Sequence, residues 1–143
     1  MTRDDVVALF AGRQDAWDVR DAANLAATHA EHGIVVSPMF TTVRGRADIR
    51  GSYQSLFRIF PDWTYTPEQL LVDGDRVAQS FAATATHTGE FMGLEGSGRR
   101  CVIHGVLLFR LERGLIAEER RFYDFTGLLV QIGILRTKPA KTP

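Results

Sequence analysis

The stretch that decides the fold reads Phe109-Arg-Leu-Glu-Arg-Gly-Leu-Ile-Ala-Glu-Glu-Arg-Arg-Phe-Tyr-Asp-Phe-Thr-Gly-Leu-Leu-Val-Gln-Ile-Gly133. Two apolar-rich segments, residues 100–111 and 115–125, flank Glu112-Arg113-Gly114, which has the composition of a short hairpin loop with Gly where a positive φ is needed. Because side chains alternate along a strand, each face of the second segment receives one acid and one base from Glu118, Glu119, Arg120 and Arg121. A buried face of this strand would therefore hold an ion pair.

Two registers of the hairpin are open, and they bring different side chains to the inner face. If the turn is centred on Arg113 and Gly114, His104 lies opposite Tyr123, and Val106 and Leu108 lie opposite Arg121 and Glu119. A three-residue loop would exchange this set for Glu118, Arg120, Phe122 and Asp124. The register thus decides which charges enter the interior.

Length and charge limit the partners of the chain. Its 143 residues suit one domain, which can bury about two-thirds of the surface of the unfolded chain. Lys plus Arg and Asp plus Glu are 17 each, so the net charge is zero and neither nucleic acid nor a membrane is expected as a partner. The start has no signal-peptide core, and runs such as residues 106–109 are too short to span a bilayer, so we expect a cytoplasmic protein. Cys101 is alone, and no spacing of Cys and His predicts a metal site.

The order of elements predicts an α+β fold. Apolar residues recur at helical spacing between residues 4 and 26, and Gly33 is expected to stop this helical region. A short strand at 34–38, a helix at 46–60 and strands at 64–72 and 76–88 follow. A glycine-rich loop at 89–98 then leads to the hairpin. Helices thus precede a meander of antiparallel strands with one covered face, and residues 136–143 are expected to form a mobile tail.

Several strings resemble the SnoaL-like polyketide cyclase family of the nuclear transport factor 2-like superfamily, from about residue 4 to residue 135. They are Phe60-Pro-Asp-Trp63, Asp73-Gly-Asp-Arg-Val77, Thr86-His-Thr-Gly-Glu-Phe-Met-Gly93, Gly98-Arg99, Ile116-Ala-Glu-Glu119, Tyr123-Asp124 and Gly127-Leu-Leu-Val-Gln-Ile-Gly133. The resemblance implies one domain, residues 1–135, with a cone-shaped, curved antiparallel sheet and three helices of the N-terminal half enclosing an apolar pocket. It also implies a homodimer formed through the sheet. Members include ring-closing enzymes, relatives include ketosteroid isomerases and limonene epoxide hydrolases, and others are catalytically silent.

Candidate catalytic residues are His104, Glu119 and Arg121. The resemblance favours the first register, which also matches pocket-lining positions of the relatives and groups these side chains with Tyr123 in an apolar cone. Burial would shift their pKa values toward general acid or base behaviour. Arg121 stands where the relatives carry an acid-base aspartate, and arginine cannot release its proton. Glu119 or His104 would then move the proton while Arg121 holds an enolate, carboxylate or phenolate oxygen. In the alternative, Glu119 and Arg121 simply neutralise each other and His104 is a wall residue.

Candidate substrate contacts are mostly aromatic. The set is Trp17, Tyr53, Phe57, His87, Phe91 and Tyr123. Phe91 and Met92 belong to the glycine-rich loop, which we expect to form a flap over the cavity. The alternatives are that the aromatics are ordinary core residues and that His87 makes a structural bond to the loop. His29 and His32 are expected near a helix end, without a metal.

These observations predict a cofactor-independent general acid-base enzyme. Its substrate would be a lipophilic carbonyl compound, ester or epoxide, and its reaction a cyclisation or isomerisation in secondary metabolism. An epoxide hydrolase-like enzyme is an alternative that Arg121 argues against. A non-catalytic binding or dimerisation module is the other, and a closed cavity with a saturated Glu119–Arg121 pair would be its sign.

Overall fold

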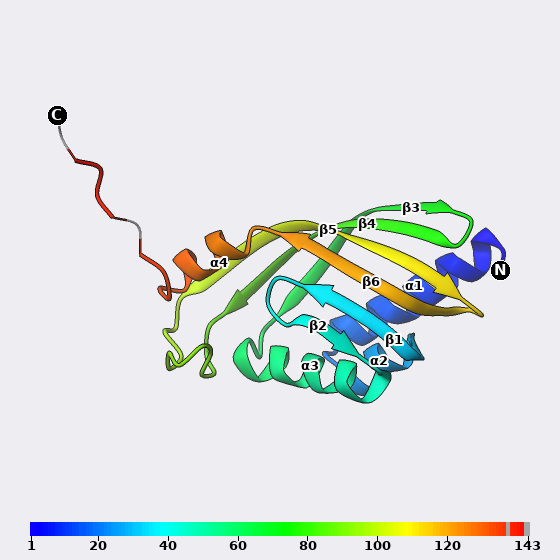
Figure 1. The fold of residues 1–143 in the computed structure, drawn as a ribbon, viewed down its shortest axis with the longest axis horizontal. Coiled ribbons are helices and arrows are strands. Elements are labelled where there is room, and N and C mark those ends of the chain that lie inside the picture. Colours follow the sequence, from blue (N-terminus) through cyan, green and yellow to red (C-terminus); the bar gives the residue numbers. More distant parts are fainter. Residues whose placement is uncertain (137, 142–143) are drawn as a thin grey trace.

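The computed structural model describes residues 1–136 and 138–141. The predicted mobile tail therefore includes residues 137, 142 and 143, which lie outside the described residues. In chain order the elements are α1 (Arg3–Asp18), α2 (Ala22–Ala27), β1 (His29–Ser37), β2 (Thr41–Arg44), α3 (Arg46–Ile59), β3 (Thr64–Asp73), β4 (Arg76–Thr86), β5 (Arg100–Glu112), β6 (Leu115–Tyr123) and α4 (Phe125–Gln131) (Figure 1).

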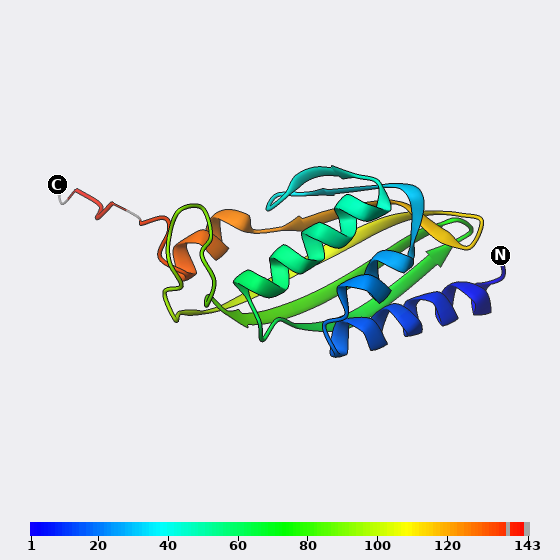
Figure 2. The same ribbon diagram turned by 90° about the horizontal axis from the view of Figure 1, so that it is seen from below.

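One six-stranded sheet, in the order β2-β1-β6-β5-β4-β3, forms the frame of the fold. The helices α1, α2 and α3 gather on one side of it, in front of the strands when the molecule is seen from below (Figure 2). The predicted α+β class, with a curved sheet and three helices of the N-terminal half, is confirmed. One detail differs, because β1 pairs with β6 in parallel while the other neighbouring strands are antiparallel. No helix of the described residues is long and apolar enough to cross a membrane.

Helix α1 begins at a capping box. The Thr2 hydroxyl accepts a hydrogen bond from the Asp5 amide at 3.1 Å, and the Asp5 carboxylate accepts one from the Thr2 amide at 2.8 Å. The buried stripe of the helix combines four apolar residues with one arginine, namely Val6, Phe10, Arg13, Ala16 and Trp17. Helix spacing thus carries a charge into the interior.

The second helical segment ends earlier than we predicted. Helix α2 stops at Ala27, and β1 begins at His29 rather than after Gly33. Gly33 lies within the strand, where a Cβ would lie only 3.0 Å from the Ala30 carbonyl oxygen. Close backbone packing, and not a helix stop, is therefore the reason for glycine at this position. His29 moves from a predicted helix end into the buried start of a strand.

The β5–β6 hairpin starts in the predicted register and then leaves it. Arg113 and Gly114 form the turn with φ of 52° and 79°, and Leu111 faces Ile116. A bulge after this pair shifts the register, so that Phe109 faces Glu119. An extra residue in one strand is what defines such a bulge. The pairings further from the turn are Leu107 with Arg121 and Gly105 with Tyr123, so the predicted partners Leu108, Val106 and His104 were wrong by one residue.

After β6 the chain closes with a short helix. Asp124 is the N-cap of α4, and its carboxylate accepts a hydrogen bond from the Gly127 amide at 2.8 Å. Leu128, Leu129 and Ile132 then bury their side chains. Asp124 thus caps a short apolar helix that covers one end of the core.

Candidate functional site

An apolar pocket lies between the helices and the sheet. Its cavity volume of about 30 Å3 is room for one or two water molecules, so a larger ligand requires its walls to move. Arg121 is the only charged side chain among the described residues that line it. The full lining is Trp17, Met39, Phe40, Leu56, Trp63, Tyr65, Phe81, Ile103, Leu107, Arg121 and Tyr123.

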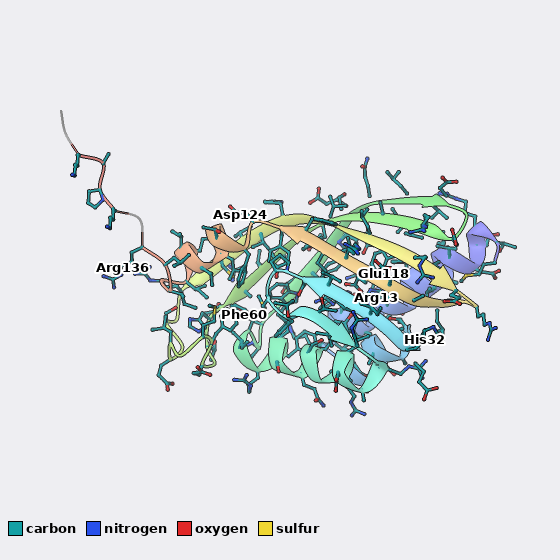
Figure 3. All side chains as sticks on the ribbon, viewed as in Figure 1. Arg13, His32, Phe60, Glu118, Asp124 and Arg136 are labelled. Atoms are coloured by element: carbon teal, nitrogen blue, oxygen red, sulfur yellow. The ribbon has the colours of Figure 1, made fainter. Side chains whose placement is uncertain are left out.

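Behind the pocket wall, Glu119 joins two arginines that come from different elements. Its Oε1 accepts a hydrogen bond from Arg13 Nη2 at 2.8 Å, and its Oε2 accepts one from Arg121 Nε at 2.6 Å. Glu119 and Arg13 are almost fully buried, whereas the Arg121 side chain keeps 10% exposure. Figure 3 shows Arg13 on α1, the helix that lies behind β1 and β6 in this view. One carboxylate therefore ties the helix layer to the sheet.

Electrostatics keep Glu119 ionised. Burial alone would raise the pKa of its carboxyl group, but the positive charges of Arg121 and Arg13 and the hydrogen bond from Arg121 outweigh burial and hold the pKa at about 2. The same carboxylate raises the pKa of Arg13 and of Arg121 despite their burial. Because both oxygens of Glu119 are occupied and its pKa is low, this carboxylate is a weak general base in the observed arrangement.

His29 and Tyr53 complete the buried cluster. The His29 Nε2 atom lies 3.0 Å from the Tyr53 hydroxyl and 3.3 Å from Arg13 Nη1. Arginine can only donate, so Nε2 accepts and the ring proton is on Nδ1, which has no partner among the described residues. Burial is the main cause that lowers the pKa of His29 to about 3, and Arg13, Arg121 and Arg46 act in the same direction against Glu119. His29 is therefore neutral at physiological pH.

The aromatic candidates fall into two groups. Trp17 and Tyr123 line the pocket, and burial raises the pKa of Tyr123 to about 12, so its hydroxyl stays protonated. Tyr53 is fully buried behind the wall, where its hydroxyl accepts a hydrogen bond from Arg121 Nη2 at 3.3 Å. Phe57 packs edge-on against Trp17 with ring centroids 6.0 Å apart. The structure thus brings Trp17 and Tyr123 to the pocket and leaves Tyr53 and Phe57 as supports.

His104 does not join this cluster. It lies on the outer face of the sheet with the other even-numbered residues of β5, and its side chain is 74% exposed and lies 3.9 Å from Glu68. The bulge in β6 turns Glu119 and Arg121 to the opposite, inner face. Its predicted position beside Glu119, Arg121 and Tyr123 was wrong, because the prediction had no bulge in β6. A side chain on the outer face cannot reach a substrate in the inner pocket.

The glycine-rich loop is attached to the end of α3. The amides of Thr88 and Gly89 donate to the Ile59 carbonyl at 2.9 and 3.0 Å. Phe91 is buried and packs edge-on against Phe125, contrary to the predicted exposed flap, while Met92 is 61% exposed. Neither Phe91 nor Met92 is part of the pocket lining.

His87 makes a structural bond to this loop. Its Nδ1 accepts a hydrogen bond from the Ser97 amide at 3.1 Å and lies 2.9 Å from the Ser97 hydroxyl. It is fully buried and does not line the pocket. Its observed contacts are therefore those of the alternative in which His87 makes a structural bond to the loop.

Sequence reasoning missed Arg13 and His29. A signal existed for Arg13, since it shares the stripe of Val6, Phe10 and Trp17, and a charge at such a position calls for a buried partner. The sequence held no comparable signal for His29, because its burial depends on the early start of β1.

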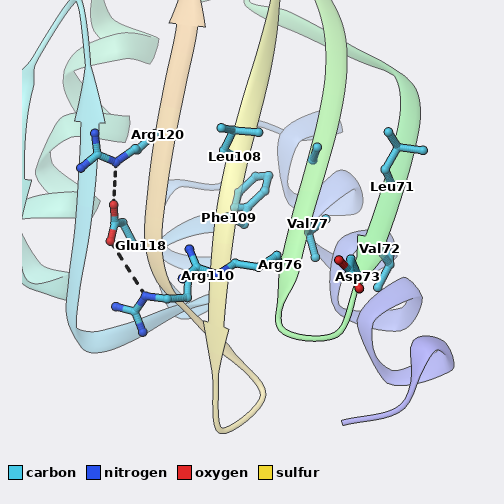
Figure 4. Close-up of a pocket in the computed structure, with 11 residues that line it drawn as sticks. Leu71, Val72, Asp73, Arg76, Val77, Leu108, Phe109, Arg110, Glu118 and Arg120 are labelled. Carbon is cyan, nitrogen blue, oxygen red and sulfur yellow. Dashed lines mark hydrogen bonds and ion pairs between the residues drawn. The ribbon is translucent and has the colours of Figure 1, made fainter.

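The outer face of the sheet carries a second, open groove (Figure 4). Its charged members include Glu118, which lies 2.6 Å from Arg120 Nε and 3.9 Å from Arg110 Nε. Large apolar side chains on the same face are also exposed, with Phe122 at 52% and Leu108 at 44%. Consecutive residues of β6 therefore build two separate ion-pair systems, Glu119 with Arg121 inside and Glu118 with Arg120 outside.

With both faces described, the fold can be compared with known proteins. The sequence profile of SnoaL-like polyketide cyclases matches residues 8–132. The chain belongs to the SnoaL-like polyketide cyclase family. A search of curated proteins found no match.

Solved structures agree with membership of the SnoaL-like family. AclR from Streptomyces galilaeus, provisionally described as a hydroxylase, is 28% identical over 96% of this chain and 91% of its own, with a TM-score of 0.81. IdmH from Streptomyces antibioticus, provisionally described as a polyketide cyclase, is 28% identical. The match covers 89% of this chain and 97% of IdmH, with a TM-score of 0.74. A SnoaL-like protein from Jannaschia sp. CCS1 shares the fold, with a TM-score of 0.82. It is 23% identical, and the match covers 93% of this chain and 94% of the Jannaschia protein.

The buried cluster makes Glu119 essential to stability. Glu119→Gln leaves Arg13 and Arg121 without a counter-charge, and we expect it to lower the free energy of unfolding by about 3–5 kcal/mol. Glu118→Gln, on the outer face of the same strand, should change it by less than about 1 kcal/mol. Urea denaturation of both variants measures these changes. Equal losses in the free energy of unfolding would show that the buried pair contributes no more to stability than the surface pair.

His29 predicts sensitivity to acid. The unfolded chain takes up a proton near the ordinary pKa of 6.5, but the folded chain does so only near 3. Lowering the pH through this window therefore favours the unfolded state, by about 2 kcal/mol between neutral pH and about pH 5. His29→Gln should remove that part of the loss. Denaturation of the wild type and the variant at both pH values measures it, and parallel losses would contradict the assignment.

Proposed function

We propose that this SnoaL-like protein is a cyclase-type enzyme that binds a lipophilic carbonyl compound in the inner pocket and catalyses its cyclisation or isomerisation. The observation that carries the proposal is the position of Arg121. Among the described residues that line the pocket, its guanidinium is the single charge in an otherwise apolar and aromatic wall, and Glu119 and Tyr53 hold it in place. A fixed cation in a largely apolar site stabilises negative charge that develops on a substrate oxygen.

In this proposal the roles of the candidate residues change. Arg121 binds the oxygen of an enolate or phenolate whose proton has passed to solvent, and Tyr123 can donate a hydrogen bond because its hydroxyl stays protonated. Glu119 orients Arg121 and is not the base, since its pKa is about 2 and two arginines occupy its oxygens. Trp17 offers an apolar wall to a flat ring.

A non-catalytic ligand-binding module is the second candidate. The small cavity and the saturated Glu119 favour it, because both leave little room for proton transfer. Epoxide hydrolysis has less support, since the lining holds no carboxylate among the described residues that could activate water.

Turnover separates these candidates. Poly-β-ketone methyl esters and epoxides would be incubated with the wild type, Arg121→Gln and Arg120→Gln, and the products followed by chromatography. We expect consumption of a ketone ester, a loss of about 100-fold or more in kcat for Arg121→Gln, and little change for Arg120→Gln. Binding of the esters without turnover by the wild type would favour the non-catalytic module instead.

We also propose that the protein is a homodimer through the outer face of the sheet. The exposed apolar side chains on β5 and β6 support this, because they share one face with the open groove. They are Val102, Val106, Leu108 and Phe122.

Light scattering after size exclusion tests the dimer. The wild type should have twice the 16.0 kDa mass of one chain, whereas the double variant Leu108→Arg with Phe122→Arg should have the mass of one chain. Val7→Arg, on an exposed apolar position of α1, is the control and should stay dimeric. A wild-type mass of 16.0 kDa would contradict the proposal.

A further inference from the structure

The buried cluster does not balance its own charge. Arg13 and Arg121 each carry one positive charge, Glu119 carries one negative charge, and His29 is neutral. The cluster therefore has a net charge of about one positive unit. Arg46 adds a further cation nearby, since its Nε and Nη2 atoms donate to the His29 carbonyl at 3.0 and 2.8 Å.

No second acid compensates this charge. In the part of the chain that the structure describes, Glu119 is the only carboxylate within ion-pair distance of Arg13 or Arg121. The centroid of the Tyr53 ring lies 5.9 Å from the guanidinium carbon of Arg13 and 5.4 Å from that of Arg121. These contacts offset part of the desolvation cost of the two guanidinium groups but supply no negative charge. A buried ion without a counter-charge is costly.

The unbalanced charge faces the pocket through Arg121. Arg13 lies deeper, at 1% exposure, and donates to Thr28 and Glu119. Arg121 donates from Nε to Glu119 and from Nη2 to Tyr53, but its Nη1 makes no hydrogen bond within the described chain. Arg121 lines the pocket, so the pocket wall contains a cationic side chain with one guanidinium nitrogen that has no hydrogen-bond partner among the described residues.

We propose that the pocket takes its ligand as a monoanion, with an ionised enol, phenol or carboxylate oxygen against Arg121. The inference concerns the same pocket as the proposed function and adds the charge state of its occupant. An anion at this position would complete a neutral set of two arginines and two negative groups. A ligand that arrives ionised also needs no strong base from the protein, which agrees with the engagement of both Glu119 oxygens.

The probe is 4-nitrophenol, whose absorbance reports its own ionisation. Binding would be measured by isothermal titration calorimetry across the pH range in which the free phenol ionises, and the bound spectrum recorded at each pH. The uncharged isostere 4-nitrotoluene is the ligand control. Arg121→Gln is the test variant, because it leaves Arg13 and Glu119 as a neutral pair, and Arg120→Gln is the matched control on the outer face.

We expect the phenolate to bind at least about tenfold more tightly than the phenol, which lowers the pKa of the bound probe by about one unit. Arg121→Gln should abolish this preference, Arg121→Lys should restore part of it, and Arg120→Gln should leave it unchanged. Weaker binding of the phenolate than of the phenol or 4-nitrotoluene, no binding of the phenolate, or the same preference in Arg121→Gln would overturn the proposal.

The binding preference for the anion can be measured whether or not the protein turns over a substrate. Anion preference without conversion of any ketone ester would remove the proposed enzymatic function and leave the anion site in place. Conversion of a neutral ester without anion preference would support the enzymatic function and remove the proposed anion site.

Discussion

The two hydrogen bonds that Glu119 accepts from Arg13 and Arg121 are the constraint on which the rest of the site depends. They join α1 to β6 through the core, and they fix the guanidinium that faces the pocket. They also determine the chemistry, because they hold the carboxylate in its ionised form. Glu119, which the sequence suggests as a base, therefore acts to hold the Arg121 guanidinium in place.

The charged and the neutral polar groups of the cluster lie at different depths. Arg121 and Tyr123 offer positive charge and a hydrogen-bond donor at the pocket, while His29 and Tyr53 lie behind the wall as neutral groups. Such a site suits a substrate that brings its own negative charge. The small volume of the pocket implies that part of its wall moves when a larger ligand enters, and Met39 and Phe40 at the β1–β2 turn belong to that wall.

The two faces of the sheet carry two separate ion pairs. Each odd-numbered residue from Glu119 to Tyr123 points inward, and the even-numbered residues between them point outward. Glu118 and Arg120 pair on the surface, in water, where such a pair contributes little to stability. Glu119 and Arg121 make the same type of pair in the core, where the loss of either partner is costly. Burial, rather than residue type, distinguishes the two pairs.

The sequence by itself determined the α+β class, the Arg113-Gly114 turn and the presence of an ion pair on a buried face. These features follow from local rules of periodicity, turn conformation and side-chain alternation. Tertiary structure decided the rest. The bulge in β6 placed Glu119 and Arg121 on the inner face, opposite to that of His104, and the parallel pairing of β1 with β6 brought His29 beside Glu119. Arg13 is 106 residues from Glu119 in the chain, and only packing of α1 on the sheet brings them together. Contacts between distant segments depend on how strands pair and bend, which local patterns do not encode.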